Sequence, residues 1–369
     1  MRTYRTSWQK LVPTLLILLL VASIFIAACG DDKDKATPTP ATTATPVMVI
    51  PTATPMPTVS QTDASHSDTA SVPQDDAPHS NTRIEWWYYN GHLETPQGNR
   101  YAFHYVMFQS SVAGILGNIA HLSVSDPQKD IYSFDQRMSP ALPVPKEHPG
   151  FAFDLTGWKM SGYNGHDELS AFTPDYALDL TLEQEKPPVL HQGTGLVSLG
   201  EDAKSYYYSR TRLAISGTIN VHGTETTVTG LGWFDHQWGN FSPLSMGWDW
   251  FDLQLSDGSD IMLNVGRQPY FRFGSFVMPD GTVSHLAANE YEVLSTESWA
   301  SSISGAVYPS AWRIKIPARG IDITVVPVIQ QCEFDASSTT HNYYWEGEVM
   351  VSGNRSGRGF VELTGYSHN

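Results

Sequence analysis

The chain has 369 residues, with 38 acidic against 22 basic side chains and a formal net charge of -16. This balance argues against a nucleic-acid partner, because binding to phosphates depends on clustered lysine and arginine side chains. Aromatic residues make up 12% of the chain and charged residues only 16%, which excludes wholesale disorder and predicts a large buried core.

The first 28 residues have the features of a secretion signal. Arg2, Arg5 and Lys10 precede an apolar run over residues 11–28 that ends at Cys29. Small residues before a cysteine resemble a bacterial lipobox, where the signal is cleaved and the cysteine is lipidated. The alternative is a transmembrane anchor, since the run approaches the roughly 20 residues that span a bilayer. We expect cleavage before Cys29 and an extracytoplasmic lipoprotein that is anchored to the cell membrane by its lipid.

Residues 29–80 are predicted to form a disordered tether. Prolines stand among repeated threonine and alanine residues, and positions 31–80 contain no aromatic residue. Such a composition buries too little apolar surface to offset the entropy of ordering. Proline-rich chains are extended and semi-rigid, so this segment is expected to hold a folded part away from the membrane.

The remainder of the chain has strand patterns almost throughout. Residues 101–108 and 167–182 alternate bulky and small or polar side chains, as half-buried strands do. Residues 210–223 have the pattern of a strand closed by a glycine turn, and residues 313–326 that of a hairpin. Only residues 286–299 show a weak helical period. Short strands at about ten-residue spacing predict an all-β fold of barrels or sandwiches.

A short internal repeat predicts two β domains. The aromatic-rich stretches Trp86–Leu93 and Trp248–Leu255 are 162 residues apart, and each precedes a glycine-containing turn and another apolar strand. This offset is about the length of one domain. With a break near residues 240–246, we predict domains over residues 81–241 and 242–369.

Eight motifs of the folded part occur in the order found in one protein family. They are Glu85–Leu93, Ala120–Ser123, Gly230–Gly239, Gly247–Leu255, Asp257–Gly258, Tyr308–Trp312, Tyr344–Gly347 and Gly359–Tyr366. On these motifs the chain resembles the AttH and carotenoid 1,2-hydratase family of lipocalin-like proteins, often described as predicted secreted hydrolases. The resemblance covers essentially all of residues 81–369. It implies two consecutive lipocalin-like antiparallel β-barrel domains.

The same resemblance implies activities, with one departure. In the wider family these are hydration of carotenoid or isoflavonoid double bonds and, in fungi, cyclisation of polyketide-type substrates. The hydratase pattern has a Tyr-x-Asp pair on the strand after the tryptophan-rich segment. Here residues 261–265 are Ile-Met-Leu-Asn-Val, which argues against carotenoid hydration specifically.

Asp235, His236 and Trp238 are the candidate catalytic residues. Hydration of an unactivated alkene needs a proton donor, such as a carboxylic acid in apolar surroundings, and aromatic faces that tolerate positive charge. In an extended segment Asp235 shares one face with Gln237, and His236 shares the other with Trp238. Either Asp235 alone or His236 with Trp238 therefore faces a cavity, and the resemblance implies a functional His and Trp here. The alternative is a structural corner at the domain break.

Six further residues are candidate substrate-binding groups: Glu85, Trp86, His104, His121, Trp248 and Trp250. For Glu85, a rim position paired with Arg83 or Arg100 competes with a buried acid inside the barrel. The two later tryptophans share a strand face and pack either in the core or around a ligand. His92, His104 and His121 lack a closely spaced ligand pair, so we predict no metal site. Tyr344–Gly347 and Glu362 are expected to buttress the second barrel.

Several enzyme classes are set aside. The chain has no Gly-x-Ser-x-Gly elbow, no P-loop and no dinucleotide-binding glycine motif. We predict a cofactor-free enzyme, either a hydratase (a lyase) or an isomerase or cyclase, that uses acid catalysis on a hydrophobic polyene or isoprenoid-like substrate bound between two β-barrels. The alternative is a non-catalytic lipocalin-like carrier of apolar ligands. In both cases the partner is a hydrophobic small molecule.

Overall fold

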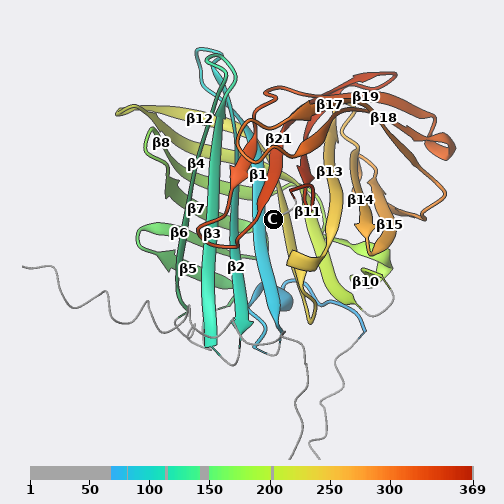
Figure 1. Ribbon diagram of the computed structural model, residues 1–369, viewed down its shortest axis with the longest axis horizontal. Helices are drawn as coiled ribbons and strands as arrows, with labels where there is room; N and C mark the ends of the chain where they lie inside the picture. Colours follow the sequence, from blue (N-terminus) through green and yellow to red (C-terminus); the bar gives the residue numbers. More distant parts are fainter. Residues whose placement is uncertain (1–67, 81, 113–114, 142–148, 201–202, 368–369) are drawn as a thin grey trace, which may run out of the picture. The chain divides into compact units, whose positions relative to one another are not determined.

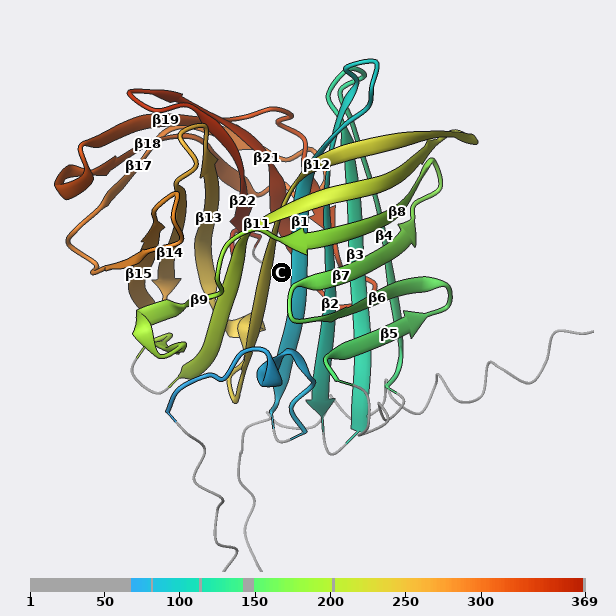
Figure 2. The same cartoon turned by 180° about the vertical axis from the view of Figure 1, so that it is seen from behind.

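The computed structural model describes residues 68–80, 82–112, 115–141, 149–200 and 203–367. These residues form two curled antiparallel sheets of twelve and ten strands, which lie side by side in Figures 1 and 2. The all-β prediction is confirmed. The predicted signal, Cys29 and the tether up to residue 67 lie outside the described residues, so lipidation stays a prediction. Within the described part of the chain, no helix has the length and hydropathy of a membrane span.

The first sheet runs in the order β4-β3-β2-β1-β12-β11-β8-β7-β6-β5, and β9 and β10 pair onto β11. Its strands are β1 (Ile84–Glu94), β2 (Arg100–Val112), β3 (Ile115–Asp126), β4 (Ile131–Pro140), β5 (Phe151–Leu155), β6 (Trp158–Tyr163), β7 (His166–Phe172), β8 (Tyr176–Gln184), β9 (Val189–Leu190), β10 (Leu196–Ser198), β11 (Lys204–Val221) and β12 (Thr224–Gly239). β1 pairs with β2 on one side and with β12 on the other. The last long strand of this sheet therefore lies beside its first.

The second sheet runs in the order β16-β15-β14-β13-β22-β21-β19-β18-β17, and β20 pairs onto β21. Its strands are β13 (Gly247–Leu255), β14 (Asp260–Gln268), β15 (Tyr270–Val277), β16 (Val283–Leu286), β17 (Glu292–Ala300), β18 (Val307–Ile316), β19 (Ile321–Pro327), β20 (Glu333–Asp335), β21 (Tyr343–Gly353) and β22 (Gly357–Leu363). The described helices are single 3-10 turns: η2 (Gln74–Asp76), η3 (His191–Gly193), η4 (Pro243–Ser245) and η5 (Pro317–Arg319).

Strand alternation divides the buried side chains into separate cores. On β1, Trp87 and Tyr89 belong to the core of the first sheet, while Tyr88 belongs to a core that also contains Trp233 and Trp250. This second group draws its members from both sheets, because alternate residues of a strand point to opposite faces. The aromatic residues that make this chain unusual are thus partly used to join the two sheets.

The structure differs from the predicted disordered tether over its last residues. Residues 68–80 pack against the first sheet: Ala70 is buried, and its N–H donates to the carbonyl of Thr194 at 2.8 Å. Asp76, within η2, is fully buried and forms an ion pair with buried Arg210 at 2.8 Å. Composition alone hides such a segment, because its order depends on a few specific contacts with the barrel rather than on its apolar content.

The helix that the weak period over residues 286–299 indicates is also a wrong prediction. These residues end β16 and form most of β17, an edge strand that pairs only with β18. β17 is largely exposed, so it has few of the apolar residues that would reveal a period of two. The hairpin expected over residues 313–326 is confirmed as β18 and β19, joined through η5.

Candidate active site

A cavity with a volume of about 610 Å³ lies between the two sheets. Its wall is mostly apolar and rich in aromatic residues, and three carboxyl groups face it. The lining includes Trp86, Tyr88, His121, Tyr207 and Asp235 from the first sheet, and Trp248, Trp250, Tyr344, Glu346 and Glu362 from the second. A concave, mostly apolar cavity with a few converging polar groups is the usual form of a small-molecule site.

Three tryptophans predicted to bind substrate form part of this wall. Trp86 packs edge-on against Phe241, with ring centroids 5.7 Å apart. The indole N–H of Trp250 donates to the hydroxyl of Tyr207 at 2.9 Å. The indole N–H of Trp248 donates to the carboxylate of Glu362 at 3.2 Å. Because these N–H groups are satisfied, the apolar ring surfaces can contact a ligand without an unpaired polar group. Trp250 lines the cavity and also packs in a core, so the two alternatives for it, core packing and ligand contact, are compatible.

Asp235 is the cavity-facing acid on β12. Its carboxylate accepts hydrogen bonds from the indole N–H of Trp233 at 2.7 Å and from the hydroxyls of Ser209 and Tyr207. Burial raises the pKa of Asp235 to about 6, although these three donors favour the charged form and limit the rise. Near neutral pH this group is therefore ionised but close to its titration range.

Glu346 and Glu362 are direct cross-strand neighbours on β21 and β22. The hydroxyl of Tyr88 donates to Glu346, which joins the pair to the first sheet. Burial and the nearby charge of Glu362 raise the pKa of Glu346 well above its usual value. Burial raises the pKa of Glu362 to about 7, and the charge of Asp235 contributes to this rise. Two carboxyl groups held this close in an apolar cavity retain a proton at neutral pH.

This pair was missed by the sequence analysis, which expected these residues to buttress the second barrel. The structure places Tyr344, Glu346 and Glu362 on the cavity wall instead. A signal was present in the alternation of β21, where Trp345 belongs to the apolar core of the second sheet and its neighbours must point away from it. The sequence does not show whether the opposite face of β21 meets another sheet or water.

His236, Trp238 and Glu85 lie on the other side of the first sheet. As the alternation predicts, Asp235 alone of the three candidate catalytic residues faces the cavity, while His236 and Trp238 point into the first barrel. Glu85 is fully buried there, and one of its carboxylate oxygens is 2.8 Å from His236 Nε2 and 2.7 Å from His79 Nδ1. The expected rim pairing of Glu85 with arginine is therefore wrong.

The two predicted histidine sites differ in position. His121 lines the cavity, with Nδ1 2.9 Å from the hydroxyl of Tyr344 and Nε2 2.8 Å from that of Thr339. His104 lies outside the cavity lining, and its Nδ1 is 2.6 Å from the hydroxyl of Ser123. Burial lowers the pKa of His121 to about 3 and that of His104 well below its usual value. Both rings are thus neutral hydrogen-bonding groups rather than acids.

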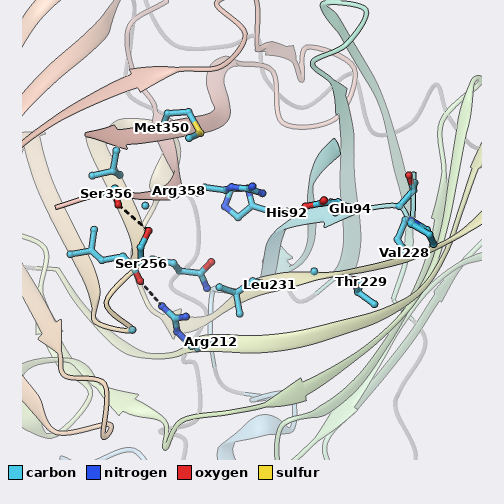
Figure 3. A pocket seen from close by; sticks show the side chains of 18 of the residues that line it. His92, Glu94, Arg212, Val228, Thr229, Leu231, Ser256, Met350, Ser356 and Arg358 are labelled. Atoms are coloured by element: carbon cyan, nitrogen blue, oxygen red, sulfur yellow. Dashed lines mark hydrogen bonds between the residues drawn. The ribbon is translucent and has the colours of Figure 1, made fainter. Parts of the chain in front are cut away.

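A second cavity, of about 820 Å³, lies elsewhere between the sheets and is shown in Figure 3. Its lining includes His92, Glu94, Arg212, Met350 and Arg358. It is lined by none of the candidate site residues predicted from sequence, and it shares no residue with the aromatic cavity. The first cavity has three carboxyl groups with raised pKa and the three tryptophans predicted to bind substrate, and it is therefore the candidate active site.

Comparisons with known proteins place this architecture in a family. The AttH-like family model matches residues 63–366. The crystal structure of a putative AttH protein from Nitrosomonas europaea superposes with a TM-score of 0.74 at 29% identity, over 81% of this chain and 98% of that one. The crystal structure of kievitone hydratase from Nectria haematococca has a TM-score of 0.68 at 17% identity, over 80% of this chain and 92% of that one.

One curated relative is similar in sequence. A kievitone hydratase from Fusarium solani subsp. phaseoli is 21% identical over 200 residues, or 52% of this chain. The match spans about half of that relative's length, at 53%. The family-model match extends over most of the described residues and includes both sheets. The chain belongs to the AttH-like family.

Proposed function

We propose that this protein is a hydratase-like lyase that adds water to, or removes it from, a carbon–carbon double bond of a hydrophobic substrate in the cavity between the sheets. One observation carries the proposal: three carboxyl groups with raised pKa, Asp235, Glu346 and Glu362, share a mostly apolar cavity whose wall includes three tryptophans. The similarity to kievitone hydratases supports this reaction class.

Glu346 is the proton donor in this scheme. Its raised pKa keeps it protonated at neutral pH, so it can transfer a proton to one alkene carbon. The π bond breaks, a new C–H bond forms, and the adjacent carbon becomes a carbocation. The ring faces of Trp86 and Trp250 stabilise this positive charge through cation–π attraction.

Asp235 is the base that completes the addition. A water molecule forms a C–O bond with the carbocation, and its excess proton passes to the ionised carboxylate of Asp235. Asp235 then releases its proton to solvent and Glu346 takes one up from solvent, so the net reaction is addition of one water molecule. This division of roles follows from environment, because Asp235 has three hydrogen-bond donors and the glutamate pair faces a like charge.

The substrate is a prenylated or isoprenoid-like molecule with a branched alkene. A branched alkene gives the more stable carbocation, which a side-chain acid can form. The cavity volume of about 610 Å³ falls within the range of sites that hold drug-sized molecules. The mostly apolar wall, rich in aromatic residues, favours an apolar, planar or flexible hydrocarbon group over a charged metabolite.

The test is to incubate the purified protein with prenylated phenols and acyclic isoprenoid alkenes in H₂¹⁸O. We expect a product that carries one ¹⁸O atom on the more substituted carbon of the former double bond, detected by mass spectrometry. The Asp235→Asn variant is the comparison, since it keeps the side-chain shape without the base. Ligand that binds but emerges unlabelled from the wild-type protein would reject the enzyme and favour the apolar-ligand carrier.

The pH dependence of kcat/KM is expected to be bell-shaped, with its optimum between about 6 and 7. Below about 6 Asp235 takes up a proton and is lost as the base. Above about 7 Glu362 ionises, and its charge makes the neighbouring Glu346 a weaker acid. In the Glu362→Gln variant the decrease in kcat/KM at alkaline pH should be absent, as measured by steady-state kinetics across the pH range. An alkaline limb that is unchanged in this variant contradicts the role of the pair.

A further inference from the structure

A second cluster of titratable side chains lies inside the first barrel, on the face of the sheet opposite the cavity. It consists of His79, Glu85 and His236, and one potential ligand atom from each lies within 4.8 Å of the others. His79 comes from the N-terminal segment, Glu85 from β1 and His236 from β12. The catalytic scheme above uses none of these groups.

We propose that this cluster binds one divalent transition-metal ion, with zinc as the ion that its ligands fit best. Two imidazole nitrogens and one carboxylate oxygen form a common zinc ligand set, and a water molecule completes a tetrahedron. His79 Nδ1 and His236 Nε2 both point at the same oxygen of Glu85, at 2.7 and 2.8 Å. Two imidazole nitrogens therefore already converge on one carboxylate oxygen, and all three ligand atoms lie within 4.8 Å of one another.

The outer ring nitrogens of both histidines also have partners. His79 Nε2 is 3.6 Å from the carboxylate of Asp75. His236 Nδ1 is 3.3 Å from the hydroxyl of Tyr208, which itself donates to Asp76 and so can accept from the ring. Histidines that bind metal donate their outer N–H to such an acceptor, which fixes the ring and its tautomer. The outer nitrogen of His236 is within hydrogen-bond distance of its partner, and that of His79 has a carboxylate nearby.

Ion binding requires the two nitrogen–oxygen distances at Glu85 to lengthen slightly. Ligand atoms at about 2.0–2.2 Å from a tetrahedral zinc ion are about 3.3 Å apart, roughly half an ångström more than the present hydrogen-bond distances. His79 is able to move, since its side chain is 21% exposed and lies on the N-terminal segment. When the ion binds, His79 releases the Nδ1 proton that now points at Glu85, and the neutral ring of His236 carries its one proton on Nδ1 instead of Nε2.

The ion would join the N-terminal segment to the barrel. Its ligands connect residue 79 with β1 and β12, which are paired neighbours in the first sheet. Trp238 stacks on His79, with ring centroids 4.2 Å apart, and Trp87 stacks on His236 at 4.6 Å. Each indole therefore covers one face of a ligand ring. The expected role is to stabilise the fold rather than to act on substrate.

The experiment is calorimetric titration of the EDTA-treated full chain with zinc chloride. We expect one ion per chain and a rise in melting temperature of about 5 °C at saturating zinc. The His79→Asn and Glu85→Gln variants should each lose about 100-fold or more in affinity, together with the thermal shift. Cobalt(II) provides a second readout, because tetrahedral coordination gives intense visible absorption bands.

The matched control is His166→Asn. His166 and Glu183 also form a histidine–carboxylate pair, at 2.5 Å, but this pair is exposed and belongs to no three-ligand group among the described residues. Its loss should leave zinc affinity unchanged. Because His79 is partly exposed, its variant is expected to stay folded even if the Glu85 variant does not. Absence of stoichiometric binding to the wild type, or equal binding by His79→Asn, would overturn the proposal.

Discussion

Replacing Glu346 with glutamine is expected to lower kcat for alkene hydration by about 10² to 10⁴-fold. Glutamine has the same shape, and its amide oxygen can still accept the hydrogen bond from Tyr88, but it has no acidic proton to give. The KM should change little, because the aromatic wall that holds the substrate is intact. Steady-state kinetics on the labelled-water product measure both constants.

Glu348→Gln is the matched control for this substitution. Glu348 lies two residues further along β21, is buried like Glu346, and has His92 as its partner at 2.9 Å. It does not line the aromatic cavity. We expect its kcat to stay within about twofold of the wild type. Equal losses in the two variants would show a general effect of removing buried acids, and full activity of Glu346→Gln would exclude this residue as the donor.

The local geometry of the site was predictable, but its tertiary pairing was not. Period-two alternation shows from sequence alone that Asp235 and His236 point to opposite faces. It does not show which face meets the second sheet. That choice depends on contacts such as Tyr88 with Glu346, whose partners are 258 residues apart in sequence. The catalytic candidates could therefore be assigned to one strand, but not to one side of it.

The N-terminal segment shows a different limit. Proline, threonine and alanine dominate residues 29–80, so composition predicts disorder along the whole stretch. Yet Asp76 and His79, near its end, both have buried partners in the first barrel. A composition average over fifty residues dilutes two such side chains. Only the pairing of each with a residue of the barrel reveals that the fold begins before residue 81.

Replacing Asp76 with asparagine is expected to destabilise the protein by about 3 kcal/mol. Both carboxylate oxygens of Asp76 lie 2.8 Å from one guanidinium nitrogen of Arg210, and both side chains are fully buried. The substitution leaves the arginine charge in the interior without this partner, and that desolvated charge is the main cost. Urea denaturation of the full chain, followed by tryptophan fluorescence, measures the change in the free energy of unfolding.

Two comparisons separate this charge effect from a general loss of contacts. Asp322→Asn removes the partner of Arg313 in an exposed ion pair, so its unfolding midpoint should match the wild type. Adding Arg210→Met to Asp76→Asn removes the orphaned charge, so the double variant should be more stable than the single one. An Asp76→Asn midpoint equal to the wild type would mean that residues 68–80 do not contribute to folding. Recovery of stability in the double variant would instead show that the loss comes from the buried, unpaired guanidinium of Arg210. Residues 68–80 would then be an integral part of the first barrel.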